Sequence, residues 1–163
     1  MGRKRVVVIG ANGQLGHDLV KVLHDWELIA LTRQECDLCD FAQTRQTLTA
    51  AKPALVINTA AFTRVDACED GPDEAFRVNT YAVRHLAQLC AELEGVLMHL
   101  STDYVFGGEK RTPYSEADLP NPLNVYGVSK LAGEYFVRNL CPKHFIVQTS
   151  GLYGVTGSSG KET

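Results

Sequence analysis

A tyrosine and a lysine four residues apart are the side chains of this sequence best suited to chemistry. Tyr126 and Lys130 are spaced i and i+4 in a segment predicted to be helical, so they lie on one face of that helix. A phenol has a pKa of about 10, but a neighbouring ammonium stabilises the phenolate and lowers that pKa. The pair therefore predicts a proton-donating tyrosine, and Thr102, at the end of a predicted strand, adds a hydroxyl.

Three glycines follow the first predicted strand and open the first predicted helix. They are separated by two residues each time in Gly10-Ala-Asn-Gly-Gln-Leu-Gly16. Glycines allow a tight turn and let backbone N–H groups approach a pyrophosphate at a helix N-terminus. We therefore predict a dinucleotide-binding turn. Its contacts to the cofactor are expected from Gly10, Asn12, Gly13, Gln14, Leu15 and Gly16.

The residues after the second predicted strand bear on which dinucleotide binds. Thr32 and Arg33 offer a hydroxyl and a guanidinium at a place where an acidic residue would instead hydrogen-bond a ribose 2′-hydroxyl. This favours NADPH over NADH, although NADH stays open and Arg33 taken alone could be a surface charge. Asp37 and Leu38, in the following loop, are expected to face the adenine.

Short apolar runs alternate with segments of helical period along the chain. We predict strands over residues 5–9, 28–31, 55–57, 96–100 and 145–149, and helices near 15–23, 41–51, 73–93 and 125–138. Strands without in/out alternation, separated by helices, predict a parallel sheet covered by helices on both faces. The expected fold class is therefore α/β, with a doubly wound, Rossmann-like parallel sheet.

Segments that follow the predicted strands should meet at one edge of such a sheet, because ligands collect at the carboxyl ends of parallel strands. Residues 10–16, 58–63, 101–104 and 151–153 all follow strands and are expected to rim one crevice. Small residues in 58–63 would let the backbone approach the cofactor closely. Further cofactor contacts are therefore predicted from Ala60, Ala61 and Phe62.

The composition is that of an ordinary soluble globular domain. The chain has 163 residues, of which 45% are hydrophobic and 21% charged. A formal net charge of -3 gives no general attraction to nucleic acid or anionic membranes, and no apolar run reaches the ~20 residues of a membrane helix. We expect a cytoplasmic protein with reduced cysteines. No metal is expected, since no second Cys or His pair accompanies Cys36 and Cys39 at zinc-ligand spacing.

Four longer stretches resemble the extended short-chain dehydrogenase/reductases, and most closely the dTDP-4-dehydrorhamnose reductases. The resemblance runs along almost the whole chain. The stretches are Gly10-Ala-Asn-Gly-Gln-Leu-Gly16, Asn58-Thr-Ala-Ala-Phe-Thr-Arg-Val-Asp66, Ser101-Thr-Asp-Tyr-Val-Phe106 and Pro122-Leu-Asn-Val-Tyr-Gly-Val-Ser-Lys-Leu-Ala-Gly-Glu134.

The resemblance implies NADPH-dependent reduction of the C4 keto group of dTDP-4-dehydro-L-rhamnose to dTDP-L-rhamnose, a precursor of cell-wall polysaccharide. It implies that Thr102 and Tyr126 hydrogen-bond the keto oxygen and that Tyr126 donates the proton. Lys130 would bind the nicotinamide ribose and lower the tyrosine pKa, so that Tyr126 and Lys130 also contact the cofactor. Asp103 and Tyr104 would flank the sugar. A nucleotide sugar is thus the implied partner, and a homodimer is compatible with the family.

Two features depart from the family pattern. Gly151 stands where the family usually has Trp, so an aromatic contact to the substrate is lost. We also expect residues 1–154 to form the NAD(P)-binding domain and 155–163 to begin a truncated substrate-binding region, with the small C-terminal substrate domain missing. The 163-residue chain alone would then reduce the sugar poorly, because remote binding energy that positions the substrate is lost.

Two other functions stay open. One is a non-catalytic, dinucleotide-binding regulatory subunit that resembles the partner of methionine adenosyltransferase. The other is a different nucleotide-sugar reductase or epimerase of the same superfamily. Tyr104 argues against the dehydratases, which resemble Thr-Asp-Glu at this point and use the carboxylate to move protons. Oxidation of the cofactor by a dTDP-keto sugar would separate an enzyme from a binding protein.

Overall fold

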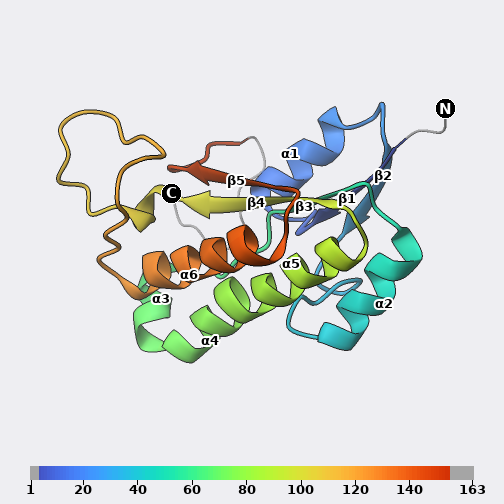
Figure 1. Cartoon of the computed structure of the whole chain (residues 1–163), viewed down its shortest axis with the longest axis horizontal. Coiled ribbons are helices and arrows are strands. Elements are labelled where there is room, and N and C mark those ends of the chain that lie inside the picture. The colour runs from blue at the N-terminus through green and yellow to red at the C-terminus, as the bar shows by residue number, and fades with distance from the viewer. Residues whose placement is uncertain (1–3, 155–163) are drawn as a thin grey trace.

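A five-stranded parallel sheet forms the centre of the molecule in the computed structural model, which describes residues 4–154 (Figure 1). The strand order is β2-β1-β3-β4-β5, and every neighbouring pair is parallel. The strands are β1 (Arg5–Ile9), β2 (Glu27–Leu31), β3 (Leu55–Asn58), β4 (Val96–Thr102) and β5 (His144–Thr149). The predicted doubly wound α/β fold is confirmed.

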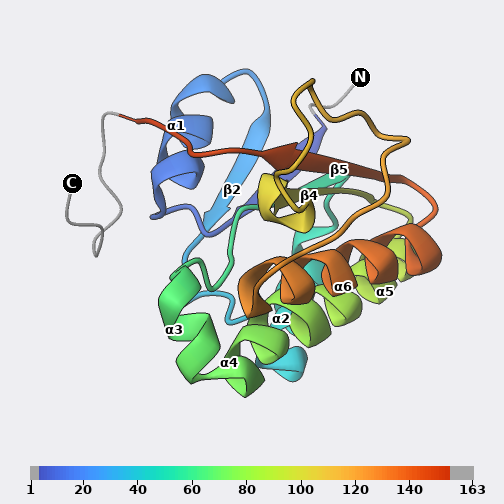
Figure 2. The same cartoon turned by 90° about the vertical axis from the view of Figure 1, so that its left-hand side faces the viewer.

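Helices cover both faces of this sheet, as the two views show (Figures 1 and 2). One face carries α1 (Gln14–Val22), and the other carries α2 (Phe41–Ala51), α5 (Ala82–Glu92) and α6 (Val125–Leu140). The side chains of β1 alternate between the two layers: Val7 and Ile9 join the larger core cluster, and Val6 and Val8 pack with α1. Because β1 is buried on both sides, its sequence shows no polar alternation.

The connection between β3 and β4 differs from the single long helix expected over 73–93. It begins with α3 (Val65–Asp70), which the sequence analysis did not predict, and continues through α4 (Pro72–Phe76), the π-helical turn η1 (Arg77–Tyr81) and α5. The π turn lies against α6, where a Cβ added to Gly133 would be 2.4 Å from the carbonyl oxygen of Asn79. The buried residues of this turn, Asn79 and Thr80, are polar, and helical segments flank it, so the sequence pattern does not reveal it.

A long loop lies at the edge of the sheet to which the arrowheads of β4 and β5 point (Figure 1). It starts after the 3-10 turn η2 (Asp103–Val105) and leads to α6. Internal contacts shape it: the rings of Phe106 and Tyr114 stack with centroids 4.3 Å apart, and Lys110 Nζ lies 2.6 Å from Asp118 Oδ2. The loop therefore overhangs the same edge as Thr102, the last residue of β4.

The limits of the described chain bear on two expectations. The predicted domain boundary at residue 154 coincides with the last described residue and stays a prediction, and the predicted substrate-binding region at 155–163 lies outside the described residues. Within residues 4–154, no helix has the length and apolar character needed to cross a bilayer.

Candidate active site

The glycine turn after β1 is built so tightly that side chains would not fit at its two ends. Gly10 has φ of +80°, a conformation that favours glycine, and a Cβ added there would lie 2.8 Å from Thr59 Oγ1. A Cβ added to Gly16 would lie only 2.2 Å from the carbonyl oxygen of Gly10. These two glycines hold the start of α1 against the end of β1.

The N-terminus of α1 is suited to an anionic group. Gly13 is its N-cap residue, no side chain caps the helix, and its first turn contains no acidic residue. The first N–H groups of a helix without a cap can bind a pyrophosphate, as the predicted dinucleotide turn requires. Gln14, the first residue of α1, donates from Nε2 to the carbonyl oxygen of Leu152 at 2.9 Å. Leu15 follows it in the first turn.

The segment after β3 lies directly beside the glycine turn. The hydroxyl of Thr59 donates to the carbonyl oxygen of Ile9 at 2.8 Å, and a Cβ on Gly10 would approach the amide nitrogen of Ala60 to 3.0 Å. Ala60, Ala61 and Phe62 are all partly exposed here. The carboxyl ends of β1 and β3 therefore form one small-residue surface at the switch point of the sheet, where doubly wound folds bind ligands.

Asn79, in the π turn η1, fixes this segment from behind. Its Oδ1 accepts from the amide of Phe62 at 2.9 Å, and its Nδ2 donates to the carbonyl oxygen of Phe62 and to Ser129 Oγ, each at 3.0 Å. Asn79 and Ser129 are buried, and sequence reasoning missed both. Neither gives a clear signal in the sequence, since Asn79 adjoins the buried Thr80 in η1 and Ser129 adjoins the buried Lys130 on α6.

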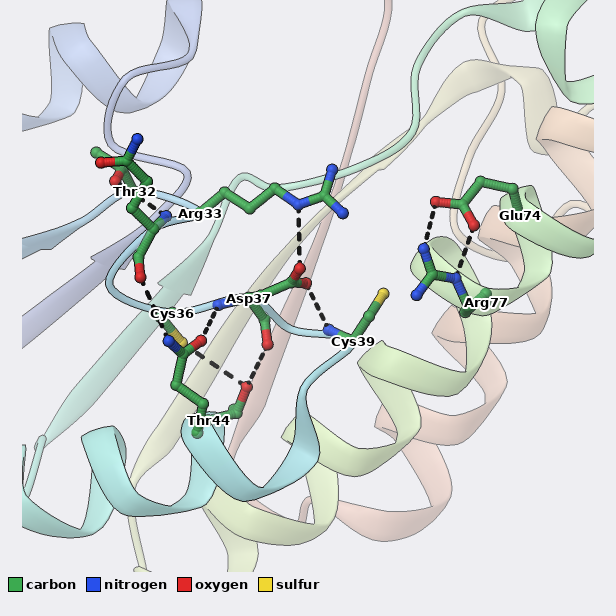
Figure 3. Close-up of polar contacts among 10 residues, drawn as sticks. Thr32, Arg33, Cys36, Asp37, Cys39, Thr44, Glu74 and Arg77 are labelled. Atoms are coloured by element: carbon green, nitrogen blue, oxygen red, sulfur yellow. Dashed lines mark hydrogen bonds and ion pairs between the residues drawn. The ribbon is translucent and has the colours of Figure 1, made fainter.

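The end of β2 forms an open pocket at the other side of the glycine turn. The residues that line it are Asn12, Thr32, Arg33, Gln34 and Asp37. Figure 3 shows the Arg33 side chain extended over this corner, with its Nε 3.1 Å from Asp37 Oδ2. Burial raises the pKa of the Asp37 carboxyl, but hydrogen bonds from the Cys39 amide and from Arg33 outweigh it, so the pKa is lowered.

Thr32 and Arg33, which are predicted to contact the adenosine ribose or its 2′-phosphate, are each paired with a carboxylate. Thr32 donates to Glu35 from its hydroxyl and, at 2.8 Å, from its amide nitrogen. Arg77 of η1 is paired with Glu74 at 2.7 Å in the same corner (Figure 3). Three of the four predicted residues around this corner thus lie together, since Asn12, Arg33 and Asp37 share one pocket. Leu38 does not join them, because its side chain is buried in the core.

Thr102, Tyr126 and Lys130 converge where β4 ends and α6 begins, and all three are buried. The Thr102 side chain lies close enough to the Tyr126 phenol to lower its pKa against the effect of burial. Thr102 Oγ1 also donates to Asp103 Oδ1 at 3.2 Å and accepts from the Tyr104 amide at 3.2 Å. The rings of Tyr104 and Tyr126 meet edge to face, with centroids 5.6 Å apart. Four of the five predicted residues of the reaction centre therefore contact one another, and Lys130 lies one helical turn after Tyr126.

The predicted lowering of the Tyr126 pKa by Lys130 is wrong in this structure. Burial raises the pKa of Tyr126, and its interaction with the Thr102 side chain only partly opposes this. Lys130 Nζ instead donates to the carbonyl oxygen of Leu100 at 2.6 Å. Burial lowers the pKa of Lys130 to about 8, against the opposing charge of Glu134. The i, i+4 spacing puts the two side chains on one face, but the ammonium is directed to β4.

Two more buried polar residues lie behind this centre, and the sequence analysis missed both. Glu134 is fully buried, although it stands in the stretch that carries Tyr126 and Lys130. His99 is fully buried on β4, with its Nδ1 3.2 Å from Asn58 Nδ2. Burial and the charge of Lys130 lower the pKa of His99 well below its usual value.

Comparison with known proteins agrees with this arrangement. Residues 4–163 match the family model described as the RmlD substrate binding domain. The chain belongs to the RmlD substrate-binding domain family. Within it, the chain is 38% identical over 162 residues to a dTDP-4-dehydrorhamnose reductase of Aggregatibacter actinomycetemcomitans, covering 98% of this chain and 55% of that protein. It is 41% identical over 156 residues to a dTDP-4-keto-6-deoxy-D-glucose reductase of Streptomyces niveus, covering 94% of this chain and 54% of that protein.

A solved RmlD-family structure is also close in fold. The crystal structure of dTDP-4-dehydrorhamnose reductase from Bacillus anthracis, in complex with NADP, matches with a TM-score of 0.94 and 38% identity. That match covers 97% of this chain and 57% of the other. The chain thus spans about half the length of the curated relatives it matches. The family resemblance predicted from the sequence is confirmed.

The position that departs from the family pattern is open in the structure. Gly151 follows β5, and a Cβ added there would meet no atom of residues 4–154 within 4 Å. Tyr153, two residues later, is fully exposed. The backbone at Gly151 therefore leaves room for a larger side chain, and the glycine is not required by packing.

Proposed function

We propose that this chain carries the cofactor-binding and proton-donating parts of an NADPH-dependent dTDP-4-dehydrorhamnose reductase. The reaction would reduce the C4 keto group of dTDP-4-dehydro-L-rhamnose to give dTDP-L-rhamnose. The observation that carries the proposal is the buried pair of Thr102 and Tyr126, whose side chains interact at the same sheet edge as the Gly10 turn. The reductases of Aggregatibacter actinomycetemcomitans and Bacillus anthracis, the latter bound to NADP, support it.

Each residue of the site would have its own role in the proposed reduction. NADPH supplies the hydride to C4 of the sugar. The hydroxyls of Thr102 and Tyr126 would orient the keto oxygen, and Tyr126 would give that oxygen its proton as negative charge develops there. The raised pKa of Tyr126 keeps the phenol protonated at neutral pH until it is needed. Lys130, an ammonium below a pKa of about 8, would bind the nicotinamide ribose, since its ammonium is directed to β4 and not to the phenol.

The fit of the site to the cofactor rests on the glycine turn and the corner beyond β2. Gly10 and Gly16 leave no space for a Cβ, so the backbone can lie close to a pyrophosphate at the start of α1. Arg33 would meet the 2′-phosphate of NADPH, because a guanidinium binds phosphate oxygens with two parallel N–H groups. Its present partner Asp37 would have to share it, which leaves NADH as the weaker alternative.

The test is to follow NADPH oxidation with dTDP-4-dehydro-L-rhamnose for the wild-type chain and for Tyr126→Phe. Loss of the phenol should lower turnover by about 10²- to 10⁴-fold, because general acid catalysis contributes that much. NADPH affinity, measured separately by fluorescence, should stay nearly constant. Tyr135→Phe is the matched control, since Tyr135 lies exposed on the same helix.

The outcomes separate the proposal from its alternatives. Equal turnover by Tyr126→Phe and the wild type would remove the proton-donor role. The chain alone is expected to reduce the sugar poorly but not to lack activity, so NADPH binding with no detectable turnover even at saturating sugar would favour the non-catalytic, dinucleotide-binding function. Turnover with a different nucleotide sugar would keep the reductase but change its substrate.

A further inference from the structure

The buried carboxylate of Glu134 joins three elements behind the proposed reaction centre. Its side chain is fully buried on α6. Oε1 accepts from Ser101 Oγ on β4 at 2.5 Å, and both oxygens lie 3.0 Å from Gln148 Nε2 on β5. Arg138 Nη2 reaches Oε2 at 3.3 Å from the solvent side. One carboxylate thus binds the ends of two neighbouring strands to the helix that carries the tyrosine and the lysine.

The position of Glu134 relates it to two residues that the proposed mechanism uses. Ser101 directly precedes Thr102 on β4, and Gln148 is the partner of Ser101 in the register of β4 and β5. Lys130 lies one helical turn before Glu134. The carboxylate therefore contacts Ser101, the residue before Thr102 on β4, and lies one helical turn after Lys130 on α6.

The charges around Lys130 leave Glu134 as its counter-charge. From β4, the buried His99 faces the ammonium, and its lowered pKa keeps it neutral. From α6, Tyr126 is a protonated phenol and Glu134 is the acidic group that acts on the lysine. Arg138 meets the same carboxylate, but about half of its side chain is exposed to screening solvent. The Gln148 amide is neutral.

We propose that Glu134 is a positioning residue of this site, which holds Thr102 and Lys130 in fixed relation and supplies the charge that keeps Lys130 an ammonium. The catalytic meaning of this role rests on the proposed function, whereas the role of counter-charge does not. Burial alone would drive a lysine to the neutral amine. With Glu134 in place, the pKa of Lys130 is still about 8, so the ammonium persists at neutral pH.

The experiment is an NMR titration of the lysine side-chain Cε signals in the full chain, with the Lys130 signal assigned by its loss in Lys130→Met. Wild-type Lys130 should titrate near 8. In Glu134→Gln its pKa should fall by about one unit or more, which is a tenfold loss of proton affinity. Glutamine keeps the volume and can accept from Ser101, and the Gln148 amide can rotate to present its oxygen.

A matched control removes a different carboxylate next to the same helix. Glu69 accepts from the amide of Val125 at the start of α6 at 2.7 Å, and it does not act on Lys130. Glu69→Gln should therefore leave the Lys130 titration in place. Glu134→Asp, which keeps the charge, should restore most of the wild-type titration. An equal shift in Glu134→Asp would mean that side-chain shape, not charge, is responsible, and would overturn the proposal.

Further outcomes bear on the counter-charge and on the reaction separately. An unchanged Lys130 titration in folded Glu134→Gln overturns the proposal. A wild-type Lys130 that is already neutral at pH 7 overturns it without any variant, should Glu134→Gln not fold. If the wild type fails to bind NADPH while the Lys130 titration shifts as expected, the proposed function fails and the counter-charge role stands. Where turnover is measurable, the pH profile of Glu134→Gln should move in the same direction as the Lys130 titration.

Discussion

Arg33 is the residue on which the choice of cofactor is expected to depend. Its side chain is exposed over the pocket after β2 and is paired with Asp37 at 3.1 Å. A charge-assisted hydrogen bond contributes about 1.5–3 kcal/mol, so Arg33→Ala should weaken NADPH binding by about tenfold to a hundredfold. NADH lacks the 2′-phosphate, and its affinity should change little. Equilibrium titrations with both dinucleotides measure the ratio.

The control for this substitution is another paired surface arginine. Arg45 on α2 forms a bidentate contact with Glu92 and lies away from the pocket residues. Arg45→Ala should leave both dinucleotide affinities unchanged. Equal losses of NADPH and NADH affinity in Arg33→Ala would show that Arg33 does not read the 2′-phosphate and acts on the pocket as a whole.

The contact between α6 and η1 sets how closely the helix that carries Tyr126 and Lys130 packs on the π turn. Gly133 is buried, and a Cβ there would lie 2.4 Å from the backbone oxygen of Asn79. Alanine favours a helix by about 1 kcal/mol over glycine, but the clash with backbone should cost more, so Gly133→Ala should lower the free energy of unfolding by about 1–3 kcal/mol. Urea denaturation measures this. Val128→Ala, at an exposed position of the same helix, should stay within about 0.5 kcal/mol.

A stabilised Gly133→Ala chain would show that the two helices can separate without loss. The substitution should also move Tyr126 and Lys130 together, since both belong to α6. We therefore expect turnover to fall more than NADPH affinity, because Asn79 holds only Phe62 on the cofactor side, whereas Gly10 of the glycine turn packs against Thr59.

The same elements show what sequence reasoning can reach. The strands, the glycine turn at Gly10 and the Tyr126–Lys130 spacing were predictable, because each depends on residues close in sequence. The π turn and the network of Glu134 were not, because their partners are distant: Ser101 is 33 residues from Glu134. The direction of the Tyr126 pKa also depends on burial and on where the Lys130 ammonium points. Helical spacing determines neither.

For the whole molecule, buried titratable groups predict how stability changes at alkaline pH. Burial raises the pKa of Cys90 to about 12, above the ordinary thiol value of 9.0. Between these two values the unfolded chain loses a proton that the folded chain keeps, so stability falls as pH rises, by about 1.4 kcal/mol per pH unit. Lys130 acts in the opposite direction. Its pKa falls from 10.5 to about 8 on folding, so the unfolded chain holds the extra proton and stability rises with pH between these values.

The two contributions should nearly cancel between pH 9 and 10.5, and removal of one should expose the other. Cys90→Ala is expected to lose some stability at pH 8 through its small cavity. Its free energy of unfolding relative to wild type should then rise by about 1 kcal/mol from pH 9 to 10, because the variant lacks the thiol that loses its proton on unfolding. Urea denaturation at each pH measures the free energy of unfolding of both proteins. The other thiols are present in both, so their contribution drops out of the difference between the two proteins. Parallel pH curves for the two proteins would mean that Cys90 ionises as easily in the folded chain as in the unfolded one, and that the core around α5 does not exclude water.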